Sequence, residues 1–140
     1  MLEHITLPES NDCQRIFHGR GHAFPGFEHV NIDWLPPVCL IIVYKDVERD
    51  WLNQAAHYLR DNISTCNSVQ VQFRNIPKAP IEILLGENVE HTEVTENGMK
   101  FNIELGKNQN YGLFPDIVNG RKWVKEHSQD KSVLNLFAYT

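Results

Sequence analysis

The segment His18-Gly19-Arg20-Gly21-His22 places three side chains that can contact an anion or a metal within five positions. An arginine between two glycines indicates a turn or an exposed loop, because glycine adopts backbone conformations that other residues avoid. In such a loop the guanidinium group can pair with a phosphate. We therefore take His18, Arg20 and His22 as candidate contacts to RNA, with a solvated turn as the alternative.

A metal site would draw on histidine and cysteine side chains, here His18, His22, His29, Cys13 and Cys39. Histidines four residues apart suit zinc when they lie on one face of a helix. Gly19 and Gly21 disfavour a helix there, so we predict no metal site. The cysteines form no CxxC pair, and we expect reduced thiols. Asp33 and Glu28 do not form a convincing acid–base pair, and we assign no catalytic residue.

Charge is distributed unevenly along the 140 residues, whose formal net charge is −5. Residues 81–104 carry six glutamates and one lysine, whereas four basic residues lie within 121–131. An RNA partner should avoid the acidic stretch. No apolar run approaches the roughly 18 residues that span a bilayer, and the first residues lack the basic start of a signal peptide. We predict a cytoplasmic protein without membrane contacts.

The elements that position these side chains follow from the periodicity of apolar residues. Residues 14–17 suit a short strand, and alternation over 30–34 predicts a half-buried one. The apolar, β-branched run 38–44 predicts a central strand. Apolar side chains at every fourth position then predict a helix over 47–62, with Asp46 as its N-cap.

Two further half-buried strands are predicted at 69–73 and 81–85. Asn97-Gly98 predicts a hairpin between 91–95 and 99–105. The order strand, strand, helix, strand, strand (β-β-α-β-β) predicts an α+β fold, in which one helix packs on the face of an antiparallel sheet.

The chain changes character after Gly106. Residues 111–115 read as a loop, Asp116 can cap a helix, and the apolar run 133–137 suits a strand. A loop, a helix and an apolar strand in this order are typical of the opening of an α/β domain. We divide the chain into an N-terminal segment (1–13), a substrate-binding module with a hairpin (14–106) and the start of a truncated domain (107–140).

Three segments in the last third of the chain carry a resemblance to a known family. They are Gln109-Asn110-Tyr111-Gly112-Leu113-Phe114-Pro115-Asp116, Asn119-Gly120-Arg121-Lys122-Trp123-Val124 and Val133-Leu134-Asn135-Leu136-Phe137-Ala138-Tyr139-Thr140. Together they resemble bacterial S-adenosylmethionine-dependent methyltransferases, which include the large-subunit ribosomal RNA methyltransferases. That family has a small β-β-α-β-β domain before a Rossmann-like methyltransferase domain. The resemblance implies that residues 107–140 hold the first helix and strand of an incomplete domain of this kind.

The resemblance also implies contacts to S-adenosylmethionine by Phe114, Asp116, Arg121, Asn135, Phe137, Ala138, Tyr139 and Thr140. The alternative is that the two phenylalanines are core residues and Asp116 is a helix cap. Val118 and Gly120 depart from the family pattern, so a polar contact could be missing. The glycine expected after Thr140 and the catalytic residues of the second half are absent. We therefore expect this chain alone neither to bind the cofactor nor to be active.

Two alternatives to a methyltransferase fragment remain open. One is a stand-alone RNA-binding module. The other is a dimerisation module, in which the apolar strand at 133–139 pairs with a second copy, because unpaired strand edges recruit partners.

Overall fold

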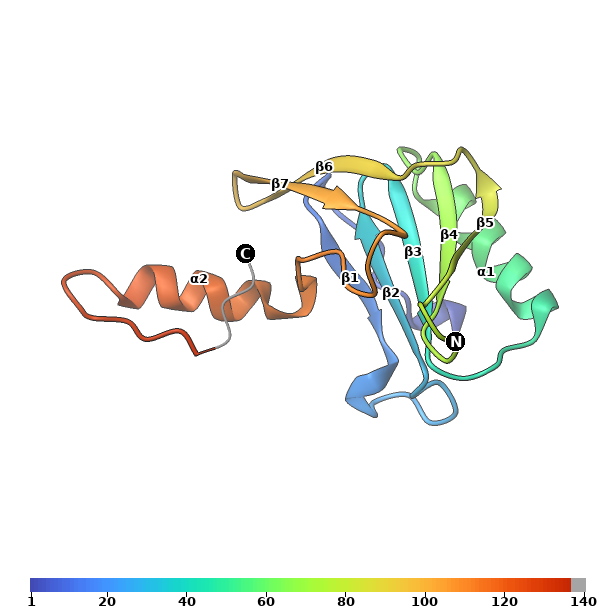
Figure 1. The fold of residues 1–140 in the computed structure, drawn as a ribbon, viewed down its shortest axis with the longest axis horizontal. Helices are drawn as coiled ribbons and strands as arrows, with labels where there is room; N and C mark the ends of the chain where they lie inside the picture. The colour runs from blue at the N-terminus through green and yellow to red at the C-terminus, as the bar shows by residue number, and fades with distance from the viewer. Residues whose placement is uncertain (137–140) are drawn as a thin grey trace.

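The structure, a computed structural model, describes residues 1–136. The strands are β1 (Gln14–His18), β2 (Val30–Leu35), β3 (Val38–Val43), β4 (Ser68–Phe73), β5 (Ile81–Gly86), β6 (His91–Glu96) and β7 (Met99–Glu104). The helices are α1 (Arg49–Asn62) and α2 (Val118–His127), with 3-10 turns at Leu2–His4, Gly19–Gly21 and Pro115–Ile117. The first five strands form one sheet in chain order, and β6 pairs with β7 (Figure 1).

The five-stranded sheet is mixed, which corrects the prediction of an antiparallel sheet. β3 and β4 run parallel, with Val38 opposite Ser68 and Val43 opposite Phe73. The other neighbouring pairs of the sheet are antiparallel. The difference follows from α1, which joins β3 to β4 as a crossover and returns the chain to the end where β3 began.

Helix α1 is confirmed, but it begins at Arg49 and not at residue 47. The N-cap is Glu48, so the predicted capping by Asp46 is wrong. The Asp46 carboxylate instead accepts a 2.6 Å hydrogen bond from the Asn75 amide. The apolar stripe of the helix, including Leu52 and Leu59, packs on one face of the sheet. Burial of each such leucine contributes about 2 kcal/mol, so this face anchors the fold.

The opposite face of the sheet is covered by the β6–β7 hairpin and the loop that follows it (Figure 1). Leu40 and Ile42 of β3 pack there against Val94, Ile103 and Leu113. The predicted hairpin is confirmed, and its two turn residues have the positive φ angles that an Asn-Gly turn requires. The sheet therefore has an apolar layer on each side.

Helix α2 extends away from the sheet and buries none of its side chains (Figure 1). Its N-cap is Ile117, so the predicted capping by Asp116 is wrong. The predicted strand is also wrong over 133–136, where the chain is irregular and Leu134 is 81% exposed. A strand forms by pairing with another strand, and no strand within residues 1–136 pairs with this segment. The rest of that prediction, 137–140, lies outside the described residues.

No helix within residues 1–136 combines the length and the apolar character that crossing a membrane would require.

Candidate functional site

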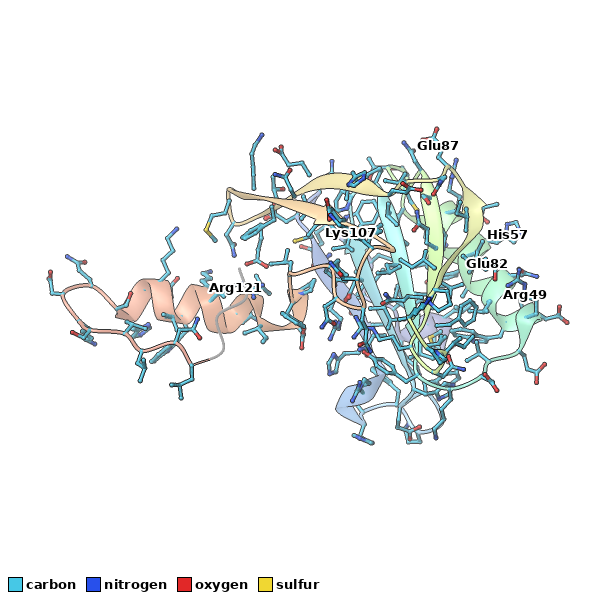
Figure 2. All side chains as sticks on the ribbon, in the orientation of Figure 1. Arg49, His57, Glu82, Glu87, Lys107 and Arg121 are labelled. Carbon is cyan, nitrogen blue, oxygen red and sulfur yellow. The ribbon has the colours of Figure 1, made fainter. Side chains whose placement is uncertain are left out.

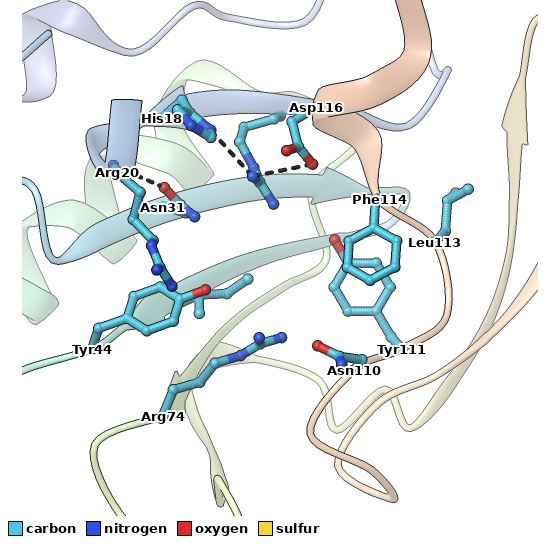
Figure 3. A pocket seen from close by; sticks show the side chains of 12 residues that line it. His18, Arg20, Asn31, Tyr44, Arg74, Asn110, Tyr111, Leu113, Phe114 and Asp116 are labelled. Carbon is cyan, nitrogen blue, oxygen red and sulfur yellow. Dashed lines mark hydrogen bonds and ion pairs between the residues drawn. The ribbon is translucent and has the colours of Figure 1, made fainter. Parts of the chain in front are cut away.

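A pocket of about 320 Å³ opens between the five-stranded sheet and the loop after β7 (Figure 3). Its walls come from four strands or strand ends, the 3-10 turn after β1 and the loop at 110–116. The lining residues are Arg15, His18, Arg20, Asn31, Ile42, Tyr44, Arg74, Asn110, Tyr111, Leu113, Phe114 and Asp116.

The period of two along each strand brings these side chains to one face. In the sheet register His18 lies opposite Asn31, Asn31 opposite Ile42, and Ile42 opposite Gln72. Tyr44 lies two positions beyond Ile42, and Arg74 lies two positions beyond Gln72, so both side chains point to this same face. The apolar hairpin covers one end of this face, and the polar end remains as the pocket.

A buried ion pair forms the floor of the pocket. Arg15 donates from Nε to Asp33 Oδ1 at 2.7 Å and from Nη2 to Oδ2 at 3.1 Å. The Tyr111 hydroxyl donates to the same carboxylate at 2.5 Å. Arg15 Nη1 lies 3.2 Å from Asp116 Oδ1 and 3.1 Å from His18 Nδ1. The loop after β7 is thus held to the sheet by hydrogen bonds to one charged pair.

These contacts shift two pKa values in the floor. Burial lowers the pKa of Arg15, but its hydrogen bond and ion pair with Asp33 outweigh that effect and raise it. Burial and the adjacent Asp33 carboxylate raise the pKa of the Tyr111 hydroxyl well above its usual value. Arg15 therefore stays cationic and Tyr111 stays a donor at neutral pH.

The mouth of the pocket carries two arginines around an aromatic ring. The guanidinium carbon of Arg20 lies 4.2 Å from the centroid of the Tyr44 ring, and that of Arg74 lies 5.7 Å from it. Arg74 also donates from Nε to Gln72 Oε1 at 3.0 Å. Among residues 1–136 neither arginine has a carboxylate within 4.0 Å, so their charge is not neutralised by a direct ion pair.

Of the three predicted RNA contacts, the structure places two at the pocket and one outside it. His18 and Arg20 line the pocket, with the Arg20 backbone amide 3.4 Å from the Asn31 side-chain oxygen. His22 is exposed, in the left-handed conformation that ends the 3-10 turn, and does not line the pocket.

The predicted cofactor contacts that the structure describes lie on two different cavities. Phe114 and Asp116 line the pocket with His18 and Arg20. Arg121 and Asn135 line a second, more open cavity of about 1090 Å³ along α2. These four residues do not share one cavity among residues 1–136, and their contact with S-adenosylmethionine stays a prediction. Phe137, Ala138, Tyr139 and Thr140 lie outside the described residues.

Arg121 lies in the first turn of α2 (Figure 2) and pairs with a buried carboxylate of β6. Its Nε donates to Glu96 Oε1 at 2.8 Å, and its Nη2 donates to Glu96 Oε2 at 2.6 Å and to the Phe114 carbonyl at 2.9 Å. Glu96 is buried at the hairpin turn. The pair therefore joins α2 to the β6–β7 hairpin and to the loop that lines the pocket.

Metal-binding side chains do not gather anywhere within the described residues. The cysteines are free thiols in the core. Burial, followed by the nearby Glu96 charge, raises the pKa of Cys13 to about 12, which makes it unreactive at neutral pH.

Several lining residues were missed by the sequence reasoning: Arg15, Asn31, Tyr44, Arg74, Asn110 and Tyr111. Part of the signal is in the strands, because polar side chains that alternate with a buried apolar face must share the other face. Alternation along Val30–Leu35 places Asn31 beside Asp33, and alternation along Ser68–Phe73 places Arg74 beyond Gln72. Tyr111 lies 78 residues from Asp33 in the chain, and its place depends on tertiary packing.

Comparison with known proteins identifies the family. The family model of S-adenosylmethionine-dependent methyltransferases matches residues 14–140. The chain therefore belongs to the S-adenosylmethionine-dependent methyltransferase family, which confirms the resemblance found in the sequence.

Two curated relatives match over shorter stretches. Ribosomal RNA large subunit methyltransferase K/L of Alteromonas mediterranea is 46% identical over 56 residues, which are 40% of this chain and 8% of the relative. Ribosomal RNA large subunit methyltransferase K of Neisseria meningitidis is 51% identical over 47 residues, which are 34% of this chain and 13% of the relative. The chain thus matches only a small part of the length of these two relatives.

Solved structures show the same fold. A Streptococcus mutans chain described as a SAM-dependent methyltransferase superposes with a TM-score of 0.67 at 20% identity, over 86% of this chain and 31% of that chain. A methyltransferase structure in complex with SAH superposes with a TM-score of 0.65 at 19% identity, over 84% of this chain and 30% of that one. At these identities the likeness concerns the fold alone.

Proposed function

We propose that this chain is the N-terminal portion of a methyltransferase that acts on ribosomal RNA, and that its own part is to position the RNA. The named relatives are ribosomal RNA methyltransferases, which supports RNA as the substrate class. In this proposal residues 14–106 bind the substrate, and residues 107–140 begin the domain that binds S-adenosylmethionine.

One observation carries the positioning role. The pocket gathers two arginines without ion-pair partners in the described chain beside the rings of Tyr44, Tyr111 and Phe114. Single-stranded RNA is bound by cationic groups that meet its phosphates and by aromatic rings that stack on its bases. The overall charge of −5 would repel RNA, so binding depends on this local concentration of positive charge.

Fluorescence anisotropy with a labelled single-stranded RNA tests the proposal. Binding should be measurable at about 50 mM salt and much weaker at about 200 mM, because phosphate contacts release counterions. An RNA affinity that is absent at both concentrations would contradict the positioning role. A DNA strand of the same sequence serves as the control for recognition of the ribose hydroxyl.

Self-association is a second candidate role, and the apolar surface around α2 favours it. Trp123, on α2, is 60% exposed, and Leu136, in the segment that follows α2, is 75% exposed. Sedimentation should show a dimer that dissociates when Leu134→Asp places a charge within this surface. A wild-type chain that sediments as a monomer at high concentration would remove this candidate.

A further inference from the structure

We propose that the pocket seats one phosphodiester group of a single-stranded RNA segment, held by Arg20, Arg74 and the Asn31 amide. This inference rests on the proposed RNA-binding function and adds a particular site to it. It is carried by three features: a buried donor, a pair of guanidinium groups and the size of the pocket.

The buried donor is the side-chain amide of Asn31. Asn31 is 2% exposed, and its oxygen accepts from the Arg20 backbone amide at 3.4 Å. Its nitrogen donates to no residue within 1–136 and points into the pocket (Figure 3). Because this nitrogen opens on the pocket, where water can accept from it, an anionic oxygen seated there can take the place of that water.

The guanidinium groups of Arg20 and Arg74 both lie near the Tyr44 ring, Arg20 beside it and Arg74 reaching toward Asn110 (Figure 3). Contact with the ring limits the conformations of both side chains and keeps them at the same opening. Each guanidinium group can donate two parallel hydrogen bonds to a phosphate. A phosphodiester between them would meet donors from both sides and from Asn31 below.

Charge balance favours a phosphate over a neutral ligand. The Arg15 cation in the floor is already compensated by Asp33 and Asp116. Three cations, Arg15, Arg20 and Arg74, stand against the two carboxylates of Asp33 and Asp116, so the pocket and its floor carry one net positive charge. That charge matches the single negative charge of a phosphodiester, which would neutralise the site.

The size of the pocket limits what can enter with that phosphate. A volume of about 320 Å³ is at the lower end for small-ligand sites, enough for about one nucleotide. Tyr111 and Phe114 line the wall opposite Tyr44, where they can contact a base or ribose (Figure 3). A duplex could touch only the mouth of the pocket, because its bases are stacked and paired.

Point variants test the seat directly, with a short single-stranded RNA of mixed sequence as the probe. Arg20→Gln and Arg74→Gln should each weaken binding about tenfold, since each removes charge-assisted hydrogen bonds. Asn31→Asp keeps the shape of the side chain but replaces the donor with a carboxylate, and it should weaken binding at least as much. The matched control is Arg49→Gln, an arginine on α1 paired with Glu82, away from the pocket (Figure 2).

Thermal unfolding identifies variants that have lost their fold. Arg20 is exposed, so Arg20→Gln is the substitution that should disturb the fold least. If folded pocket variants bind RNA as tightly as Arg49→Gln, the phosphate seat is wrong while RNA positioning stands. If the wild-type chain binds no RNA at any salt concentration, the proposed function fails. Equal loss of affinity for duplex and single-stranded RNA in the variants would also overturn the inference, because it would indicate a contact at the mouth alone.

Discussion

Arg15 holds the buried carboxylate of Asp33 through two hydrogen bonds, of 2.7 and 3.1 Å, across the pairing of β1 with β2. Tyr111 and Asp116 bind to this pair from the loop after the hairpin. One charged pair therefore connects the sheet, whose strands lead into Arg20 and Arg74, with the segment that leads into α2. The shape of the pocket depends on it.

Asp33→Asn should destabilise the fold by about 3 kcal/mol, because the Arg15 cation loses its buried, bidentate carboxylate partner and keeps only the more exposed Asp116. Urea unfolding measures the change. The control is Glu82→Gln, which removes the carboxylate of an exposed pair and should have little effect. Equal effects of the two substitutions would show that the buried pair does not organise the pocket.

Tyr111→Phe should cost about 2 kcal/mol at pH 7, since it removes a hydrogen bond to a charged group. Folding raises the pKa of Tyr111 above its ordinary value of 10.0. The folded chain therefore keeps this proton when the unfolded chain loses it. The stabilisation is complete below pH 10 and declines as pH rises toward the folded pKa, so the two proteins should converge in stability there. A difference that grows above pH 10 would contradict the assignment.

Glu96→Gln should loosen α2 from the hairpin, because Arg121 loses its carboxylate partner. We expect a loss of about 2 kcal/mol in stability and faster amide exchange along α2. Glu93→Gln is the matched control, since Glu93 lies on the same hairpin and pairs with Lys100 at the surface. Unchanged exchange along α2 in Glu96→Gln would mean that other contacts hold the helix.

Gly19→Ala should destabilise the fold by more than about 3 kcal/mol. A Cβ at this position would lie 1.9 Å from the Phe27 carbonyl oxygen and 2.4 Å from that of Val30. Gly26→Ala is the control, because its Cβ would meet nothing within 4 Å and the cost, about 1 kcal/mol, comes from its positive φ. A stable Gly19→Ala protein would show that the turn carrying Arg20 can move.

Local patterns were enough to predict most of the elements. The apolar stripe of α1, the alternation of β2 and the Asn-Gly turn each depend on residues close in the chain. The direction of β4 depends on how α1 crosses the sheet, and the strand predicted at 133–137 depends on a neighbour that the described residues do not provide. Apolar, β-branched composition favours a strand but cannot supply its hydrogen-bonding partner.

The candidate site was predicted only in part. The glycines around Arg20 indicated the turn at the mouth, and the family motif indicated Phe114 and Asp116. No pattern of neighbouring residues shows that these two segments lie together, because they meet through Arg15 and Asp33 in the floor. The wall formed by Tyr44 and Arg74 could not be predicted from the sequence, because it depends on which strands are neighbours in the sheet.

The most direct test of RNA binding in this pocket is an NMR titration of the chain with single-stranded RNA. We follow the side-chain amide signals of Asn31 and the Nε–H signals of Arg20 and Arg74, with Arg49 as an internal reference. The account predicts saturable shifts of the pocket signals at RNA concentrations that leave Arg49 unchanged. Shifts confined to α2, or equal shifts at all arginines, would contradict it.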